Sequence, residues 1–369
     1  MASLDWLSVN VYARNVFPSR FGQGAAGPAV NVSTRAEVRP DVEVGGVGGS
    51  GRAQLVFVHG IGGVRDAGQE CRDWVEALAH GAREAGHADD VSGLTQGWLA
   101  EARFADYSDL FAAWQTQGSG GVEPGAEEVA FLDPFVRNVV DELGRQAEEK
   151  EDSQSQLVIA GARAQLCPDG GEQQGLGAPV RMLGRALTTI LQVPGLKRAA
   201  QWANGRSLLG HLAQVGRYLD RGEADAAGRT LDVRARDRVL QGVDPERPLV
   251  VVAHSLGSVV AFEALHHYAG QVGLLVTLGS PLATGAAVLQ RVSPQPPRTP
   301  ESVQRWLNFW DRDDIIVARP RVETWMRQSF SGVAPHTKRV DSDGVWVHTA
   351  TKYLRQPGVA GPIVEALKK

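Results

Sequence analysis

The sequence predicts an α/β protein in which a mostly parallel sheet carries helices on both faces. Short apolar runs without polar alternation, such as LVVVA (residues 249–253), are typical of strands that are buried on both sides. Segments with helical periodicity lie between such runs. In residues 66–85, for example, Trp74, Leu78 and Ala82 fall on one helical face. Strands that alternate with helices in this way pair in parallel, because each helix crosses over the sheet.

The other elements are expected in chain order from the same two patterns. The first strand and the next strand with its turn are AQLVFVHG (53–60) and GWLAEARFADYSDLF (97–111). Helical periodicity then extends over residues 127–150, 180–191 and 196–219. Beyond the strand at 249–253, we expect strands in VGLLVTLGS (272–280) and RWLNFW (305–310), and a last strand and helix that reach the C-terminus.

Composition divides the chain into three parts. We expect residues 1–52, which are rich in Gly, Pro and Ser, to form a flexible lead-in. The core is expected in two segments, 53–117 and 248–369, with a helical insertion between them at 118–247. In the insertion, Leu208, Leu212, Val215 and Leu219 fall on one helical face. This face either packs on the core or lines a cap that receives an acyl chain.

Charge and composition exclude several classes of protein. A net charge of -4 without a basic run gives no reason to expect a nucleic-acid partner. Cys71 and Cys167 lie far apart in no metal-ligand spacing, which predicts no metal site and suits a reducing compartment. The N-terminus does not resemble a signal peptide, and no segment approaches the ~20 apolar residues of a transmembrane helix. We therefore expect a soluble cytoplasmic protein.

A serine stands where the apolar strand at residues 249–253 ends and a helix begins. The pentapeptide AHSLG (253–257) has the form of a nucleophile elbow, in which a tight turn strains the serine backbone and presents an exposed hydroxyl above the sheet. Gly257 suits the close passage of strand and helix at such a turn. Ser255 as a mere helix N-cap would leave Ala253 and Gly257 unexplained. The pattern predicts that Ser255 is a nucleophile.

Three more segments accompany this pentapeptide, namely HGIGG (59–63), TLGSPL (277–282) and NFWDRDDIIVA (308–318). Together they resemble the α/β-hydrolase superfamily in its lipase and serine-esterase branches, where small bacterial lipases also carry alanine at the first position of the pentapeptide. The resemblance covers about residues 53–111 and 246–368. It implies an α/β-hydrolase fold and a serine hydrolase that acts on an acyl ester or lipid substrate through an acyl-enzyme, with no cofactor.

In the family that the chain resembles, the base is a histidine that follows the serine and the acid in the sequence. The histidines after Ser255 are His266, His267, His336 and His348. The first two lie near the end of the helix that leaves the elbow, where a histidine commonly meets the helix dipole. His348 ends the apolar run GVWVH and is expected at the carboxyl end of a strand, where open α/β sheets build their sites. We therefore predict His348 as the base in preference to His336.

The acid is expected directly after the strand RWLNFW. Asp311, Asp313 and Asp314 all stand there. Asp314 precedes the apolar residues IIV, so the chain turns back toward the core and can place this carboxylate under the imidazole. The aspartate that precedes an apolar pair is also the catalytic one in the similar hydrolases. Asp314 is therefore the predicted acid, with Asp311 and Asp313 as alternatives.

The glycine-rich segment FVHGIGG (57–63) ends the first strand, at the place where α/β hydrolases position a loop that donates a backbone N–H to the oxyanion. We expect the N–H groups of Ile61 and Leu256 to form this oxyanion hole, although an ordinary glycine-rich turn explains the same residues. His59 is expected to brace the loop and not to act as a base.

Cleavage of a carboxylic ester is therefore the function that the sequence favours. A peptidase, an amidase or a thioesterase can use the same three residues, so these activities stay open. A partner-regulated effector or interaction protein on the same fold is a further alternative from another class.

Overall fold

The computed structural model describes residues 51–60, 62–111, 126–167, 178–193, 205–314, 316–317, 320–342 and 347–369. Contacts divide the chain into Met1–Gly49 and Ser50–Lys369, and every helix and strand in the described ranges belongs to the second unit. Apart from Gly51 and Arg52, the lead-in expected over residues 1–52 lies outside the described residues.

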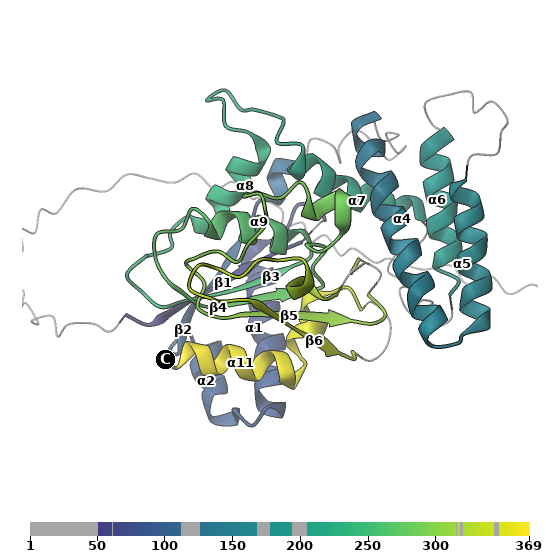
Figure 1. Ribbon diagram of the computed structural model, residues 1–369. Coiled ribbons are helices and arrows are strands. Elements are labelled where there is room, and N and C mark those ends of the chain that lie inside the picture. The colour runs from purple at the N-terminus through teal and green to yellow at the C-terminus, as the bar shows by residue number, and fades with distance from the viewer. Residues whose placement is uncertain are drawn as a thin grey trace, which may run out of the picture. The chain divides into compact units, whose positions relative to one another are not determined.

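A six-stranded sheet forms the centre of the described unit (Figure 1). Its strands are β1 (Ala53–Val58), β2 (Ala100–Ala105), β3 (Leu249–His254), β4 (Val272–Leu278), β5 (Trp306–Asp311) and β6 (Pro335–Val340). They lie in the order β2-β1-β3-β4-β5-β6, and every neighbouring pair is parallel. The predicted parallel α/β architecture is thus confirmed, and all six carboxyl ends lie at one edge of the sheet.

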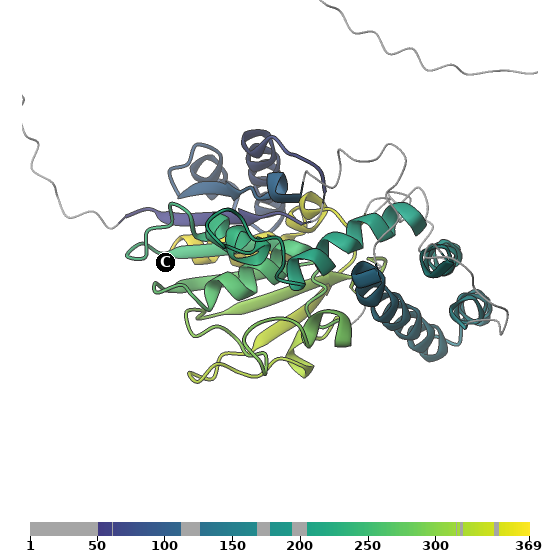
Figure 2. The same cartoon turned by 90° about the horizontal axis from the view of Figure 1, so that it is seen from above.

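Helices cover both faces of this sheet (Figures 1 and 2). The helices in the described ranges are α1 (Ala67–Glu84), α2 (Val91–Thr95), α4 (Ala126–Glu149), α5 (Ser153–Leu166), α6 (Ala178–Ile190), α7 (Gly205–Leu219), α8 (Leu231–Leu240), α9 (Leu256–Leu265), α10 (Ala350–Leu354) and α11 (Pro357–Leu367), of which α5 and α6 pack on other helices beside the sheet. Single helical turns occur at Ala88–Asp90, Ser108–Phe111, Gly285–Leu289 and Val322–Thr324. No helix in the described ranges is both long and apolar enough to cross a membrane.

Strand β3 shows why its sequence lacks polar alternation. Val250 and Val252 belong to a hydrophobic cluster shared with α1 and α11, whereas Val251 and Ala253 belong to a second cluster shared with α9. Successive side chains of a strand point to opposite faces, so both faces of β3 are covered by helices. This burial places the residue that follows β3 at the centre of the sheet's carboxyl edge.

The ends of α1 illustrate how local sequence fixes an element. Asp66 occupies the N-cap position, and its side chain accepts a hydrogen bond from the N–H of Gln69 at 2.9 Å. Near the other end of the helix, a Cβ atom at Gly81 would lie 2.4 Å from the carbonyl oxygen of Leu354. Only glycine therefore allows α1 to pack this closely against the last residue of α10.

The last strand differs from the sequence prediction. We expected it in GVWVH, residues 344–348, but the strand that the structure describes is β6, which ends earlier at Val340. Val347 and His348 are not in a strand, and residues 343–346 lie outside the described ones. Strand β6 is hard to predict from the sequence because it is an edge strand with exposed polar residues such as His336. Residues 344–348 were predicted as a strand because they are mostly apolar, and an apolar run is typical of a buried strand.

Helices α4 to α8 lie between β2 and β3 in the sequence, in the region where we expected an insertion. Leu212 and Val215 are each 1% exposed and belong to one hydrophobic cluster with Phe131 of α4 and Leu183 of α6. Leu219 joins the same cluster, while the side chain of Leu208 lies outside the described part. The apolar face of α7 therefore packs against other helices of the same region.

Candidate active site

Ser255 connects β3 to α9 through a strained turn. Its backbone has φ +54° and ψ −128°, which is a costly conformation for a residue with a side chain. The N–H of Ser255 donates to the carbonyl oxygen of Leu278 at 3.0 Å and so fixes the turn against β4. Ser255 occupies the N-cap position of α9, but its hydroxyl forms no capping hydrogen bond. Helix capping therefore does not account for this serine.

Two glycines allow the backbone to close around this turn. A Cβ atom at Gly257 would lie 2.3 Å from the carbonyl oxygen of His59 and 2.5 Å from that of Val58. A Cβ atom at Gly60 would lie 2.6 Å from the Cβ of Ser255. Distances this short leave no space for any other side chain. The loop after β1 and the start of α9 consequently pack directly against the serine.

The structure brings the three predicted catalytic residues into one chain of contacts. Nε2 of His348 lies 2.9 Å from the hydroxyl oxygen of Ser255, and Nδ1 lies 2.7 Å from Oδ2 of Asp314. A carboxylate only accepts hydrogen bonds, so Nδ1–H donates to Asp314 and Nε2 is left to accept from the serine hydroxyl. The expectation of an exposed hydroxyl is wrong. Ser255 is only 1% exposed, because Gly60 and His348 pack against it.

Asp314 is held in place by two further donors. The hydroxyl of Tyr353 donates to Oδ2 at 2.7 Å, and the N–H of Ile316 donates to Oδ1 at 3.1 Å. Burial, reinforced by the negative charge of Asp314, raises the pKa of Tyr353 well above its usual value. Tyr353 therefore stays protonated and remains a donor to the carboxylate.

The alternative acids have other partners. Oδ2 of Asp311 accepts from both the N–H and the hydroxyl of Ser342, each at 2.6 Å, and Oδ1 accepts from the N–H of Asp313 at 2.9 Å. Asp313 forms an ion pair at 3.4 Å with the preceding arginine. Asp311 thus organises the loop after β5, and Asp314 is the aspartate that the structure places against the imidazole.

Gly279, in the TLGSPL segment, leaves space beside this pair. Its φ is +55°, and a Cβ atom there would lie 2.7 Å from Oδ2 of Asp314 and 3.2 Å from Nδ1 of His348. Any other residue would push against the contact between acid and imidazole. The segment contributes to the family resemblance, but no pattern in the sequence indicates a role for this glycine.

His254 lies beside the site without joining it. Its ring centroid is 4.6 Å from that of His348, and it meets Trp74 edge-on at 6.3 Å. His254 Nε2 is buried and has no hydrogen-bond partner in the part of the chain that the structure describes. Burial, with a smaller effect from the neighbouring His348, lowers the pKa of His254 well below its usual value, so this ring is neutral.

His59 braces the loop after β1. Nδ1–H donates to the carbonyl oxygen of Gly60 at 2.6 Å, and Nε2 accepts from the N–H of Tyr107 at 3.2 Å. The Tyr107 hydroxyl donates to the carbonyl oxygen of His59, and the two rings stack with centroids 4.0 Å apart. Burial lowers the pKa of His59, against the opposing effect of Asp106. A neutral His59 with both ring nitrogens engaged is suited to support and not to proton transfer.

Helix α7 also contacts this loop, which the sequence did not indicate. Oε1 of the buried Gln214 accepts from the N–H of Gly62 at 3.1 Å.

One of the two predicted oxyanion donors, Leu256, lies in the described part of the chain, and the other does not. Ile61 lies outside the described residues, and Leu256 is the first residue of α9, where backbone N–H groups have no partner within the helix. The oxyanion hole remains a prediction.

The other histidines that follow Ser255 lie elsewhere. Nε2 of His266 is 3.2 Å from the carbonyl oxygen of Arg298, His267 lies near Arg236, and His336 is exposed on β6.

In the described ranges, no group of His, Cys, Asp and Glu side chains is arranged to hold a metal ion. Comparisons with protein-family models, curated protein sequences and solved structures find no match to this chain.

Proposed function

We propose that the chain is a serine hydrolase of the α/β-hydrolase type that cleaves carboxylic ester bonds. One observation supports this proposal above all others. The imidazole of His348 contacts the hydroxyl of Ser255 at 2.9 Å and the carboxylate of Asp314 at 2.7 Å. A hydroxyl, a base and an acid that orients the base are what nucleophilic acyl transfer requires.

The topology is compatible with this assignment. Ser255 follows β3, Asp314 follows β5 and His348 follows β6, and parallel strands bring these three carboxyl ends to the same edge of the sheet. The order serine, acid, histidine along the chain is the order of α/β hydrolases. The strained backbone of Ser255, at φ +54°, is also what a nucleophile elbow imposes.

In the proposed reaction, the oxygen of Ser255 attacks the ester carbonyl carbon while its proton passes to Nε2 of His348. The tetrahedral intermediate collapses when the same proton passes to the departing alkoxide, which leaves as the alcohol. Water then attacks the acyl-enzyme, with His348 again as general base, and releases the acid and free Ser255. Asp314 holds the required tautomer and stabilises the imidazolium that forms in each step.

The surrounding residues support this chemistry. The N–H groups of Ile61 and Leu256 are the proposed oxyanion donors, and loss of one such donor costs about 10²–10³ in kcat. Gln214 fixes the loop that carries the first donor through its contact with Gly62. A neutral His254 beside His348 adds no repulsion when the catalytic imidazole becomes positively charged.

The proposal is tested with p-nitrophenyl esters of increasing acyl length, each compared with the matched p-nitroanilide and thioester. We expect turnover of esters, no turnover by Ser255→Ala and much slower cleavage of the amides. Equal or faster cleavage of an anilide or thioester would reassign the enzyme to the peptidase or thioesterase class. No turnover of any substrate by the folded protein would contradict the proposal.

A further inference from the structure

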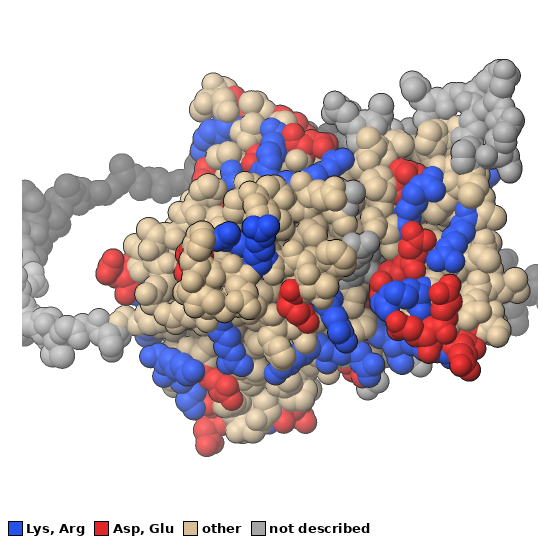
Figure 3. Space-filling view, viewed as in Figure 1, with Lys and Arg blue, Asp and Glu red and all other residues tan. Residues whose placement is uncertain are grey.

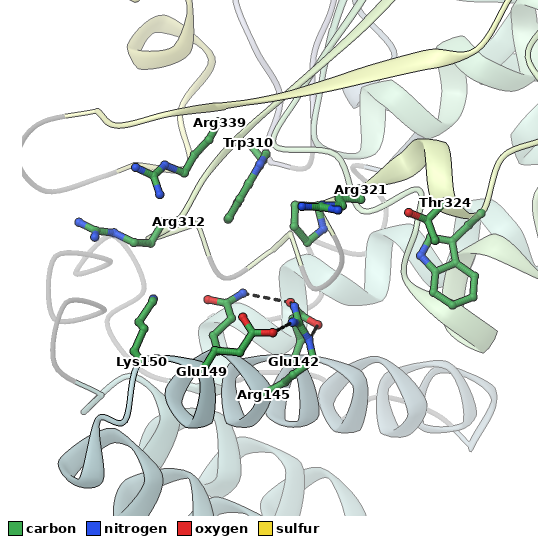
Figure 4. Close-up of a pocket in the computed structure, with 12 residues that line it drawn as sticks. Glu142, Arg145, Glu149, Lys150, Trp310, Arg312, Arg321, Thr324 and Arg339 are labelled. Atoms are coloured by element: carbon green, nitrogen blue, oxygen red, sulfur yellow. Dashed lines mark hydrogen bonds and ion pairs between the residues drawn. The ribbon is translucent and has the colours of Figure 1, made fainter.

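A cleft of about 780 Å³ lies between the end of α4 and the segments that surround β5 and β6 (Figure 4). Trp310, near the carboxyl end of β5, belongs to its lining, whereas Ser255, His348 and Asp314 do not. Among the described residues, five cationic side chains line the cleft, namely Arg145, Lys150, Arg312, Arg321 and Arg339. Two carboxylates accompany them, so this described lining carries an excess of three positive charges.

The carboxylates belong to the wall formed by α4. Glu142 and Glu149 both pair with Arg145 on the same helix, and Nε of Arg145 lies 3.1 Å from Oε2 of Glu142. Figure 4 shows these three side chains joined along α4, on the opposite side of the cleft from Arg312 and Arg339. Because one guanidinium serves both acids, the acidic charge of this wall is partly compensated before any ligand arrives.

The other four cations have few partners within the described ranges. Lys150 and Arg321 form no side-chain ion pair or hydrogen bond with any residue there, although the charge of Lys150 acts on the nearby Asp152. Arg312 pairs with the adjacent Asp313 at 3.4 Å, and Arg339 pairs with its near neighbour Asp341 at 3.0 Å. Both of these arginine side chains are half exposed, at 50% and 54%. Figure 3 shows charged side chains gathered where the end of α4 approaches the sheet.

These cations reach one cleft from four separate segments. Lys150 follows α4, Arg312 follows β5, Arg321 precedes the turn at Val322–Thr324 and Arg339 belongs to β6. In Figure 4, Lys150 extends toward Arg312, and the indole of Trp310 points from β5 toward α4. Asp313 and Asp341 offset part of the charge of Arg312 and Arg339, and an anion between the four cations would reduce their remaining mutual repulsion.

We propose that this cleft binds a phosphate group that carries at least two negative charges, from either a lipid headgroup or a soluble phosphate compound. A phosphate offers several oxygens at once, and the planar guanidinium groups of arginine pair with phosphate through two hydrogen bonds. Trp310 supplies an apolar wall for the part of the ligand next to the phosphate. The site does not depend on the proposed ester hydrolysis.

Two probes distinguish the sources. Inorganic pyrophosphate is titrated into the full-length protein by isothermal calorimetry, and vesicles of phosphatidylcholine with and without phosphatidic acid are sedimented with it. The double variant Lys150→Gln/Arg321→Gln removes the two cations that have no side-chain partner in the described part of the chain. We expect it to bind at least about tenfold more weakly than the unaltered chain, because two charge-assisted contacts to the phosphate are lost. Raised salt should weaken binding by the unaltered chain as well.

A matched control removes the same charge from other surfaces. Arg83 is exposed on α1, and Lys338 precedes Arg339 on β6 and therefore points to the opposite side of the strand. The Arg83→Gln/Lys338→Gln variant should bind like the unaltered chain, and equal melting temperatures would show that both variants fold. Binding of pyrophosphate alone, or of phosphatidic acid vesicles alone, supports the site and identifies the source. Absence of both, or an equal loss in the control, overturns it.

Discussion

Helix α9 has a buried polar cluster at each of two places, and the two clusters are built differently. At its start lies the contact chain of Ser255, His348 and Asp314. In its second half lies Glu263, which is fully buried and pairs with Arg221 at 2.6 Å. Ser255, His348, Asp314 and Glu263 are all buried, so burial alone does not separate a site from a structural network.

Both carboxylate oxygens of Glu263 accept hydrogen bonds. Oε1 of Glu263 accepts from Arg221 and from the N–H of Ser293, at 2.6 and 2.7 Å, and Oε2 accepts from the hydroxyl of Tyr218 at 2.7 Å. Arg221 also pairs with Asp232 at 2.8 Å. These contacts join the end of α7 and the start of α8 to α9. Such a network is stable because each of its charges has a partner.

The cluster at the start of α9 has a strained serine backbone and an imidazole placed between a hydroxyl and a carboxylate. Its hydrogen bonds can be rearranged by moving one proton, whereas those of Glu263 hold a permanent ion pair. Backbone strain at Ser255 and a proton that can move between side chains therefore distinguish the proposed active site from the Glu263 network, whereas burial does not. Changes at the first cluster should therefore cost activity, and changes at the second should cost stability.

The largest expected effect is that of His348→Gln. Loss of the base should lower kcat by about 10⁵–10⁶-fold, because the hydroxyl then has no proton acceptor. The melting temperature should change little in comparison. His336→Gln, at an exposed position of β6, is the control and should retain full kcat. Equal losses in the two variants, measured on p-nitrophenyl esters, would contradict the assignment of the base.

The next largest effect is expected for Asp314→Asn. An amide can stabilise the wrong imidazole tautomer, and kcat should fall by about 10⁴-fold. Asp311→Asn should reduce kcat far less, because Asp311 contacts Ser342 and Asp313 and not the imidazole. The two variants are compared at saturating ester concentration. A greater loss at Asp311 would transfer the role of the acid to that residue.

The second cluster is broken by Glu263→Gln. The amide nitrogen of glutamine would face a donor in place of an acceptor, and Arg221 would keep its pair with Asp232 but lose the one with Glu263, at a cost of up to about 3–5 kcal/mol in the free energy of unfolding. Urea unfolding measures this change, and kcat of the folded variant should stay within about tenfold of the original. The exposed Glu365→Gln variant on α11 is the control. Unchanged stability of Glu263→Gln would remove the distinction between the clusters.

The smallest effect expected is a dependence of stability on pH. Burial lowers the pKa of His254 in the folded chain, so the unfolded chain binds more protons once the pH falls below about 6.5. Stability is then fully present above that pH and is lost as the pH falls, by up to about 1.4 kcal/mol per pH unit for each such histidine. Urea unfolding at about pH 7.5 and 5.5 measures the loss, which His254→Leu should reduce. An undiminished loss in that variant would contradict a neutral His254.

Much of the fold was predictable, because strands that are buried on both faces of the sheet consist mostly of apolar residues. The runs at β1, β3, β4 and β5 are apolar for this reason, and each is a strand in the structure. Asp314 could be separated from its neighbours because apolar residues follow it, and Ile316 is indeed buried. Strand β6 was not predicted, because it is an edge strand with exposed polar residues and has no apolar run.

Contacts between residues that lie far apart in the sequence could not be predicted from it. Tyr353 meets Asp314 across 39 positions, and Gln214 meets Gly62 across 152. A tyrosine in a short helix and a glutamine in an amphipathic one have no local pattern that indicates a partner. Glu263 stands in an otherwise apolar helix, which suggests a buried charge but not which arginine neutralises it. These residues are determined by packing between elements, which only the structure supplies.

The central claim is that Ser255 is an activated nucleophile, and covalent labelling tests it most directly. A fluorophosphonate reacts with a serine whose proton is accepted by an adjacent base, so the folded protein should gain the mass of one phosphonyl group. Peptide mapping should place that adduct on Ser255, and His348→Gln should prevent it. An adduct on another serine, or an unlabelled folded protein at neutral pH, would contradict the account.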